Sequence, residues 1–135
     1  MVFDQGLGDL FVVRVAGNTI DASAAGSIEY AVAKLGAKLV YVMGHEHCGA
    51  VHAAIAGGTL PGSIPAVVKP ILPAVKTART QKGDLEHNSA VENVRLVERT
   101  MGKIDKLIAS MIKSHQVEVA GGVYDLDTGK IENVK

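Results

Sequence analysis

Residues 38–51 read KLVYVMGHEHCGAV and place an apolar segment just before the only cysteine of the chain. Lys38–Met43 is apolar nearly throughout, and such runs are typical of strands in parallel sheets that are covered on both faces. Gly44 ends the run, and we expect a helix from about Cys48 to Ala56, stopped by Gly57-Gly58. A buried strand that leads directly into a helix favours an α/β fold.

The rest of the chain continues the alternation of strands and helices. The apolar patterns predict a buried strand at Leu10–Val15, a helix from Ala24 to Leu35 capped by Asp21 or Ser23, and a strand at Val117–Tyr124 that turns into a hairpin with Ile131–Val134. Ile64–Arg79 is helix-like, but Pro70 and Pro73 should break or kink it. Ser89–His115 is one long helix or two, with Gly102 as the candidate break. We therefore expect one α/β domain over residues 1–135, with a mostly parallel sheet flanked by helices.

Composition limits the classes of function. The chain has 135 residues and a formal net charge of zero, which removes the electrostatic case for a nucleic-acid or acidic-membrane partner. No apolar run approaches the roughly 20 residues that a membrane span needs, and no signal peptide is visible. A lone cysteine cannot form an internal disulfide, so we expect a reducing, cytoplasmic setting. A net charge near zero also does not oppose self-association.

His45 and Cys48 form the candidate metal site. At a junction between a strand and a helix, a histidine and a cysteine at this spacing can reach one metal ion, and this pair of ligands suits zinc best. A helix N-terminus also favours the cysteine thiolate that binds metal. The spacing alone is a weak signal, because a lone buried cysteine is more often an inert small hydrophobic residue.

Several motifs, in order along nearly the whole chain, resemble those of the β-class carbonic anhydrases. They are VFDQGLGDLFVVRVAGN at residues 2–18, GSIEYAV at 26–32, GHEHCGAV at 44–51 and GVYDLDTGK at 122–130, which is similar to the closing hairpin of that family. The resemblance implies a β-carbonic-anhydrase-like fold and the reversible hydration of CO2 to bicarbonate at a zinc ion.

The resemblance also implies which residues form the site. In that family two cysteines and one histidine hold zinc, with a water or an aspartate as the fourth ligand. His45 and Cys48 match the second half of this ligand set, and Gln5 matches a glutamine that lines the substrate cleft and can hydrogen-bond CO2 or bicarbonate. The first half lies in a Cys-x-Asp-x-Arg motif that these 135 residues do not contain. We therefore assign no catalytic residue, since the family's aspartate–arginine pair is absent.

Two protein ligands fall short of the three that a catalytic zinc normally has. Candidates for a further ligand are His47, Asp4, Asp21, Glu46 and His52, and none has a spacing that compels the assignment. The simpler interpretation of His47, Glu46 and His52 is a solvated or hydrogen-bonded surface. We assign no chemistry to His87 or His115, and we expect an interface salt bridge for Arg14 and a local hydrogen bond or ion pair for Asp9.

The resemblance implies that the chain lacks the family's N-terminal helices and the strand that carries the first ligand motif. Neighbouring strands then close up, a strand from another copy fills the gap, or the sequence is a fragment. We expect a homo-oligomer built from dimers, as in the family.

Three functions remain open. The first is zinc-dependent CO2 hydration, with a third ligand supplied from elsewhere. The second is a catalytically silent relative that keeps the fold and oligomerisation with a weak or empty metal site. The third is a zinc-dependent hydrolase of carbon disulfide or carbonyl sulfide, as some relatives are.

Overall fold

The computed structural model describes residues 2–104 and 106–134. Its elements in chain order are η1 (Ala16–Asn18), α1 (Ala22–Ala33), β1 (Leu39–His45), α2 (Gly49–Ala56), α3 (Ile64–Val68), η2 (Lys69–Ile71), α4 (Leu72–Ala78), α5 (Leu85–Ile104), α6 (Lys106–Lys113), β2 (Glu118–Tyr124) and β3 (Ile131–Val134). The α/β class predicted from the sequence is confirmed.

The sheet is mixed, with the strand order β1-β2-β3. β1 and β2 pair in parallel from Leu39 with Glu118 to His45 with Tyr124. β3 returns antiparallel along β2, which confirms the expected hairpin, and Gly129 takes the left-handed conformation (φ 70°) in its turn. β2 is therefore the central strand, and β1 and β3 form the edges among the described residues.

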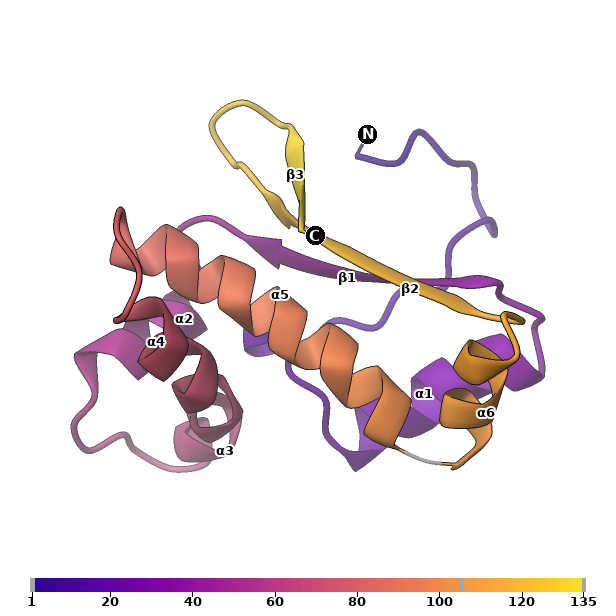
Figure 1. Ribbon diagram of the computed structural model, residues 1–135, viewed down its shortest axis with the longest axis horizontal. Helices are drawn as coiled ribbons and strands as arrows, with labels where there is room; N and C mark the ends of the chain where they lie inside the picture. The colour runs from indigo at the N-terminus through magenta and orange to yellow at the C-terminus, as the bar shows by residue number, and fades with distance from the viewer. Residues whose placement is uncertain (1, 105, 135) are drawn as a thin grey trace.

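Helix α5 covers one face of the sheet (Figure 1). Figure 1 shows α2, α3 and α4 grouped around one end of α5 and α1 and α6 around the other. The main core joins α5 to the sheet through Val42, Ala90, Val94, Val97, Met101 and Val123. A second apolar cluster joins α2 to α3, η2 and α4 through Cys48, Val51, Ala54, Val68, Ile71 and Val75. Since Cys48 belongs to this second cluster, the packing of α2 fixes the position of the candidate metal site.

Close packing of α5 on the sheet depends on glycines. A Cβ added at Gly44 would lie 2.9 Å from Val94 Cγ2, and one added at Gly121 would lie 2.5 Å from Val94 Cγ1. Such distances are shorter than a carbon–carbon contact allows. The two glycines therefore let the helix lie directly against the backbone of β1 and β2.

The prediction of a strand at Leu10–Val15 is wrong. The segment forms no strand, and its large side chains lie in the open, with Val12 65% exposed. Its β-branched residues favour extended backbone, as at Val15 (φ −135°, ψ 153°), but a strand also needs a neighbour that supplies hydrogen bonds. Within the described residues, β1 has β2 as its only strand neighbour.

The expectation that β1 is covered on both faces is also wrong. Val42 and Gly44 point towards α5 and are buried, whereas Leu39 and Met43 on the opposite face are 52% and 40% exposed. Phe3 partly covers this second face, where its ring meets that of Tyr41 edge-on at 5.3 Å between centroids. β1 thus carries an apolar run of the kind found between two layers, yet only one layer lies against it.

Helix boundaries follow local rules. Asp21 is the N-cap of α1, because its Oδ1 accepts a 2.8 Å hydrogen bond from the Ala24 amide, which decides between Asp21 and Ser23. The prolines break 64–79 as expected, and α3, η2 and α4 each have a proline in their first turn. The long helical region is two helices, but α5 continues through Gly102 to Ile104.

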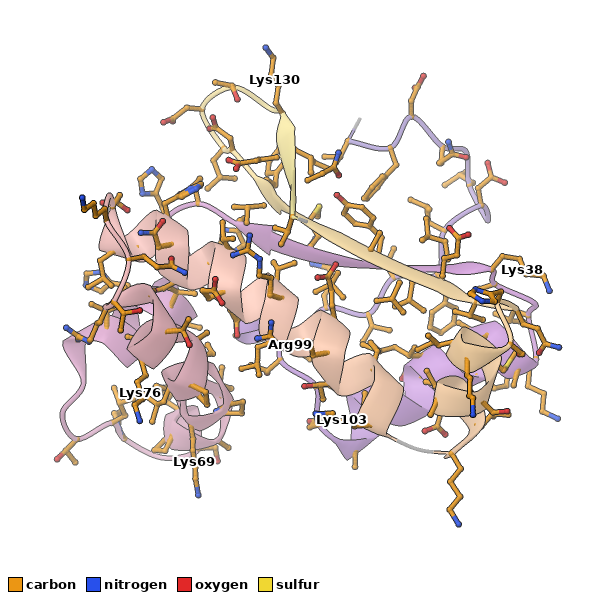
Figure 2. The ribbon with its side chains drawn as sticks, in the orientation of Figure 1. Lys38, Lys69, Lys76, Arg99, Lys103 and Lys130 are labelled. Atoms are coloured by element: carbon orange, nitrogen blue, oxygen red, sulfur yellow. The ribbon has the colours of Figure 1, made fainter. Side chains whose placement is uncertain are left out.

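Charged side chains are spread over the surface. Figure 2 shows Lys38 at one end of the molecule, Lys69 and Lys76 at the other, and Lys130 on the hairpin. Among the described residues, no helix has both the length and the apolar character needed to cross a membrane.

Candidate functional site

His45 is the last residue of β1 and is exposed. Its Nδ1 lies 2.8 Å from the carbonyl oxygen of Glu46. A carbonyl oxygen can only accept, so Nδ1 carries the proton and donates. The neutral ring then keeps its lone pair on Nε2, which is the tautomer that a metal ligand requires.

Glu46 is held at three points. Its amide donates to the carbonyl oxygen of Tyr124 at 2.9 Å, its own carbonyl accepts from His45, and its carboxylate Oε1 lies 2.6 Å from Nδ1 of His87. Because the carboxylate accepts, His87 Nδ1 donates in this contact. The three bonds join the end of β1 to β2 and to the first turn of α5.

Cys48 follows two residues later as the N-cap of α2. The turn passes through His47, whose φ of 53° lies in the left-handed region. Cys48 is a free cysteine, 4% exposed, and packs among the apolar side chains of the second cluster.

The donor chemistry of His45 and Cys48 fits zinc, but the number of donors does not complete a site. Residues 2–104 and 106–134 contain no group of three or more His, Cys, Asp or Glu side chains that could hold a metal ion. The other candidate ligands have different surroundings: Asp21 caps α1, Glu46 contacts His87, and Asp4 and His52 are exposed. A three-donor site built from described residues of one chain is therefore not present.

Gln5 lies in the exposed N-terminal segment. Its Nε2 donates to the carbonyl oxygen of Phe3 at 2.9 Å, which is a local contact. Asp9 nearby accepts from the Gly6 amide at 2.9 Å, and this confirms the local hydrogen bond expected for Asp9. The role of Gln5 towards a substrate stays a prediction.

An open cleft of about 630 Å³ adjoins the carboxyl ends of β1 and β2. Its lining comes from the β1–α2 turn, the start of α5 and the hairpin: Glu46, His47, His87, Val123, Asp125, Asp127, Thr128, Lys130, Ile131 and Glu132. Hydrogen bonds lower the pKa of Asp125, first from the Thr128 hydroxyl and then from the amides of Asp127 and Thr128. The lining has more acidic than basic side chains, so the cleft does not favour an anion such as bicarbonate.

His87 is the residue that sequence reasoning missed. It comes from the first turn of α5, far along the chain from Glu46, and no local pattern links the two. One signal exists: a histidine near a helix N-terminus opposes the dipole when it is protonated, so such a position suggests a nearby carboxylate. The structure supplies two, with Glu46 at 2.6 Å and Glu132 Oε2 at 3.7 Å from His87.

Comparison with known proteins gives consistent matches. The family model described as carbonic anhydrase matches residues 1–131. The chain is 40% identical to carbonic anhydrase 2 of Mycobacterium tuberculosis, over 96% of this chain and 65% of that protein. It is 36% identical to a carbonic anhydrase of Mycolicibacterium smegmatis, over 98% of this chain and 66% of that protein. The chain thus spans about two thirds of the length of these relatives.

Solved structures show the same fold. The β-carbonic anhydrase CcaA superimposes with a TM-score of 0.82 at 24% identity, over 96% of this chain and 69% of that one. A tetrameric β-carbonic anhydrase of Sordaria macrospora gives a TM-score of 0.80 at 23% identity, over 98% of this chain and 71% of that one. With the matches in sequence, these likenesses show that the chain belongs to the β-carbonic anhydrase family.

Proposed function

We propose that this chain is the part of a β-carbonic anhydrase that supplies His45 and Cys48 to a zinc ion, and that the complete site interconverts CO2 and bicarbonate. The observation that carries the proposal is the His45–Glu46 contact, which leaves the imidazole lone pair on Nε2 of His45, three residues before the cysteine that caps α2. Membership of the family supports this choice of reaction.

In this proposal each residue has one task. His45 offers the Nε2 lone pair, Cys48 offers a thiolate, and Gln5 hydrogen-bonds the substrate. Zinc, when bound, lowers the pKa of a coordinated water and so supplies hydroxide near neutral pH. The remaining ligands come from outside the described residues of one chain, since these residues hold no group of three donors.

A second function is favoured by that same shortage of donors. A chain with two donors binds zinc weakly, because a catalytic zinc normally has three protein ligands. The alternative is therefore a catalytically silent relative that keeps the fold and its assembly with a weak or empty metal site.

Self-association is part of the proposal. The segment from Val2 to Val15 and the open face of β1 expose large apolar side chains: Val2, Phe3, Leu7, Leu10, Phe11, Val12, Val13, Val15, Leu39 and Met43. Exposed apolar side chains that gather in one segment and on one strand face are typical of an interface. The Sordaria relative is tetrameric. Light scattering after size-exclusion chromatography tests the point, and a monodisperse species at 14.1 kDa would contradict it.

We also propose a cytoplasmic location, which rests on the single cysteine and the absence of a possible internal disulfide.

Elemental analysis and stopped-flow CO2 hydration test the proposed function together. Where the remaining ligands are supplied, we expect bound zinc and hydration above the buffer rate, and the loss of both in Cys48→Ser. Ala54→Ser is the matched control, because it adds a hydroxyl to the same apolar cluster and leaves the sulfur in place. Zinc without hydration, or a folded protein free of zinc, supports the silent relative. Zinc that survives Cys48→Ser excludes Cys48 as a ligand.

A further inference from the structure

We propose that His87 is a positioning residue for His45 and acts through Glu46. The inference rests on the proposed function in that His45 is taken as a zinc ligand. It assigns a role to a side chain on a different element from the ligand pair.

The contacts form a continuous chain. His87 Nδ1 donates to Glu46 Oε1 at 2.6 Å, and the carbonyl of the same glutamate accepts from His45 Nδ1 at 2.8 Å. Glu46 therefore accepts a hydrogen bond from each of the two histidines. The side chain of Glu46 faces α5, and its carbonyl sets the orientation of the imidazole that ends β1.

The hydrogen bond from His87 matters because the neighbouring residues do little to fix the orientation of the Glu46 carbonyl. The next residue, His47, takes a left-handed backbone conformation (φ 53°), which a side-chain-bearing residue adopts only at a cost in free energy. The Glu46 amide is bound to Tyr124, but one backbone bond does not fix the rotation of the peptide unit that carries its carbonyl. A hydrogen bond to a carboxylate is stronger than one between neutral groups, so the contact with His87 adds a second anchor.

His87 is itself well placed to act as an anchor. Its backbone amide donates to Asp84 Oδ1 at 2.7 Å at the start of α5, and its Nε2 lies 3.7 Å from Glu132 on β3. The side chains of His87 and Glu46 are 35% and 21% exposed, so water competes only in part for their hydrogen bond. The first turn of α5 thereby holds the turn that carries the ligand pair.

The chemical consequence concerns the tautomer of His45. While the Glu46 carbonyl accepts from Nδ1, the proton stays on that nitrogen and Nε2 is free for a metal. Without His87 the Glu46 peptide can rotate, and the imidazole loses its fixed acceptor. The proton then distributes between both nitrogens, and binding of zinc requires the proton to leave Nε2 first.

Three substitutions of His87 separate positioning from simple loss of a side chain. The Nδ2 of an asparagine occupies nearly the position of histidine Nδ1, whereas glutamine carries its donor at the position of Nε2. We expect His87→Asn to keep the contact with Glu46, and His87→Gln and His87→Ala to lose it. His115→Asn is the control for removing an exposed histidine, since asparagine tolerates the φ of 55° at that residue.

Two measurements decide the proposal. The first is the nitrogen chemical shifts of His45 in the metal-free protein, which report its tautomer. We expect the Nδ1–H form in the unsubstituted protein, in His87→Asn and in His115→Asn, and a mixture in His87→Gln and His87→Ala. The second is competition of the protein with a chelator for Zn²⁺, where a lost supporting bond typically weakens affinity about 10-fold or more.

The double variant Glu46→Ala/His87→Ala tests whether His87 acts on His45 through Glu46. If His87 acts through Glu46, the double variant binds Zn²⁺ no more weakly than Glu46→Ala alone. The proposal is overturned if His45 keeps its tautomer in His87→Ala and His87→Gln, or if the two single effects on affinity simply add.

The tautomer is measured without metal, so this test is independent of the proposed function. A protein that binds no Zn²⁺ contradicts the proposed ligand role, while the nitrogen shifts still show whether His87 orients His45. If His87→Ala does not fold, the comparison of His87→Asn with His87→Gln gives the same decision.

Discussion

The side chain of Asn93 on α5 donates a 2.8 Å hydrogen bond from Nδ2 to the carbonyl oxygen of Gly17. Asn93 is 1% exposed, and the same nitrogen lies 3.2 Å from Oδ1 of Asn18. This contact joins η1 to α5 across most of the chain. It lies next to the end of β1, because Asn18 Oδ1 is also a near neighbour of Gly44.

Replacing Asn93 should destabilise the protein without any change in the ligands. Asn93→Ala leaves the Gly17 carbonyl without its side-chain donor in a buried place, and we expect a loss of about 1–3 kcal/mol in the free energy of unfolding. Urea denaturation measures it. Asn88→Ala on the same helix is the control, since Asn88 donates to Lys82 in an exposed contact. Equal losses in both variants would show that burial of the contact is unimportant.

Gly44 should resist even the smallest side chain. Gly44→Ala places a Cβ 2.9 Å from Val94 Cγ2, and such overpacking typically costs about 1–3 kcal/mol. Because the obstructing atom belongs to a side chain, the double variant Gly44→Ala/Val94→Ala should lose less than the sum of the single losses. Gly102→Ala is the opposite case: it lies in α5 with open space around it, and we expect a gain of roughly 0.5–1 kcal/mol. If the losses in free energy of unfolding from Gly44→Ala and Val94→Ala simply add, the two side chains do not collide as expected.

The hairpin should lose stability in acid through Asp125. Hydrogen bonds, led by that of the Thr128 hydroxyl, lower the pKa of this carboxyl in the folded state. A lowered pKa contributes stability above the ordinary pKa of aspartate, and this contribution disappears as the pH falls through the folded-state value. In an NMR titration, Thr128→Val should raise the pKa of Asp125 only part of the way, since the amides of Asp127 and Thr128 still donate. An unchanged pKa of Asp125 in Thr128→Val would show that the Thr128 hydroxyl does not lower it.

Glu98 should behave in the opposite sense. Burial raises the pKa of this carboxyl, although Arg95 and Arg99 oppose the rise. Because the pKa of Glu98 is raised in the folded protein, this group contributes to folding stability at low pH. That contribution is lost as the pH rises through the folded-state pKa. We therefore expect Glu98→Gln to raise the melting temperature at pH 7 and to have a smaller effect near pH 4. Glu86→Gln in the first turn of α5 is the control and should give no such gain, because a negative charge there suits the helix dipole.

Sequence reasoning succeeded where the cause is local. The run Lys38–Met43, the glycine after it and the helix that follows are all set by neighbours in the chain, and β1 and α2 occupy nearly those positions. The same holds for Asp21, whose side chain caps a helix three residues away. The prolines of 64–79 act on their own helical turns, so their effect was also predictable.

It failed where the cause lies in a distant segment. Leu10–Val15 has the composition of a strand, but a strand also requires a hydrogen-bonding neighbour, and composition does not report one. Gly102 was the candidate break, yet helix interiors tolerate glycine at a cost near 1 kcal/mol, and α5 continues past it. For the candidate site, the sequence proposed His45 and Cys48, and their role as ligands stays a prediction. It did not propose His87, because the partner of His87, Glu46, lies on another element.

The parallel pairing of β1 with β2 has a consequence for the order of folding. Leu39 pairs with Glu118, and α2, α3, α4, α5 and α6 all lie between these two residues in the chain. Closing so long a loop costs entropy before the pairing returns any energy, and contacts between distant segments slow the folding of a domain. The helices can form early from local contacts, whereas the pairing of His45 with Tyr124 requires the whole intervening chain to be brought together. We therefore expect the turn that carries His45 and Cys48 to be among the last parts of the molecule to acquire its final shape.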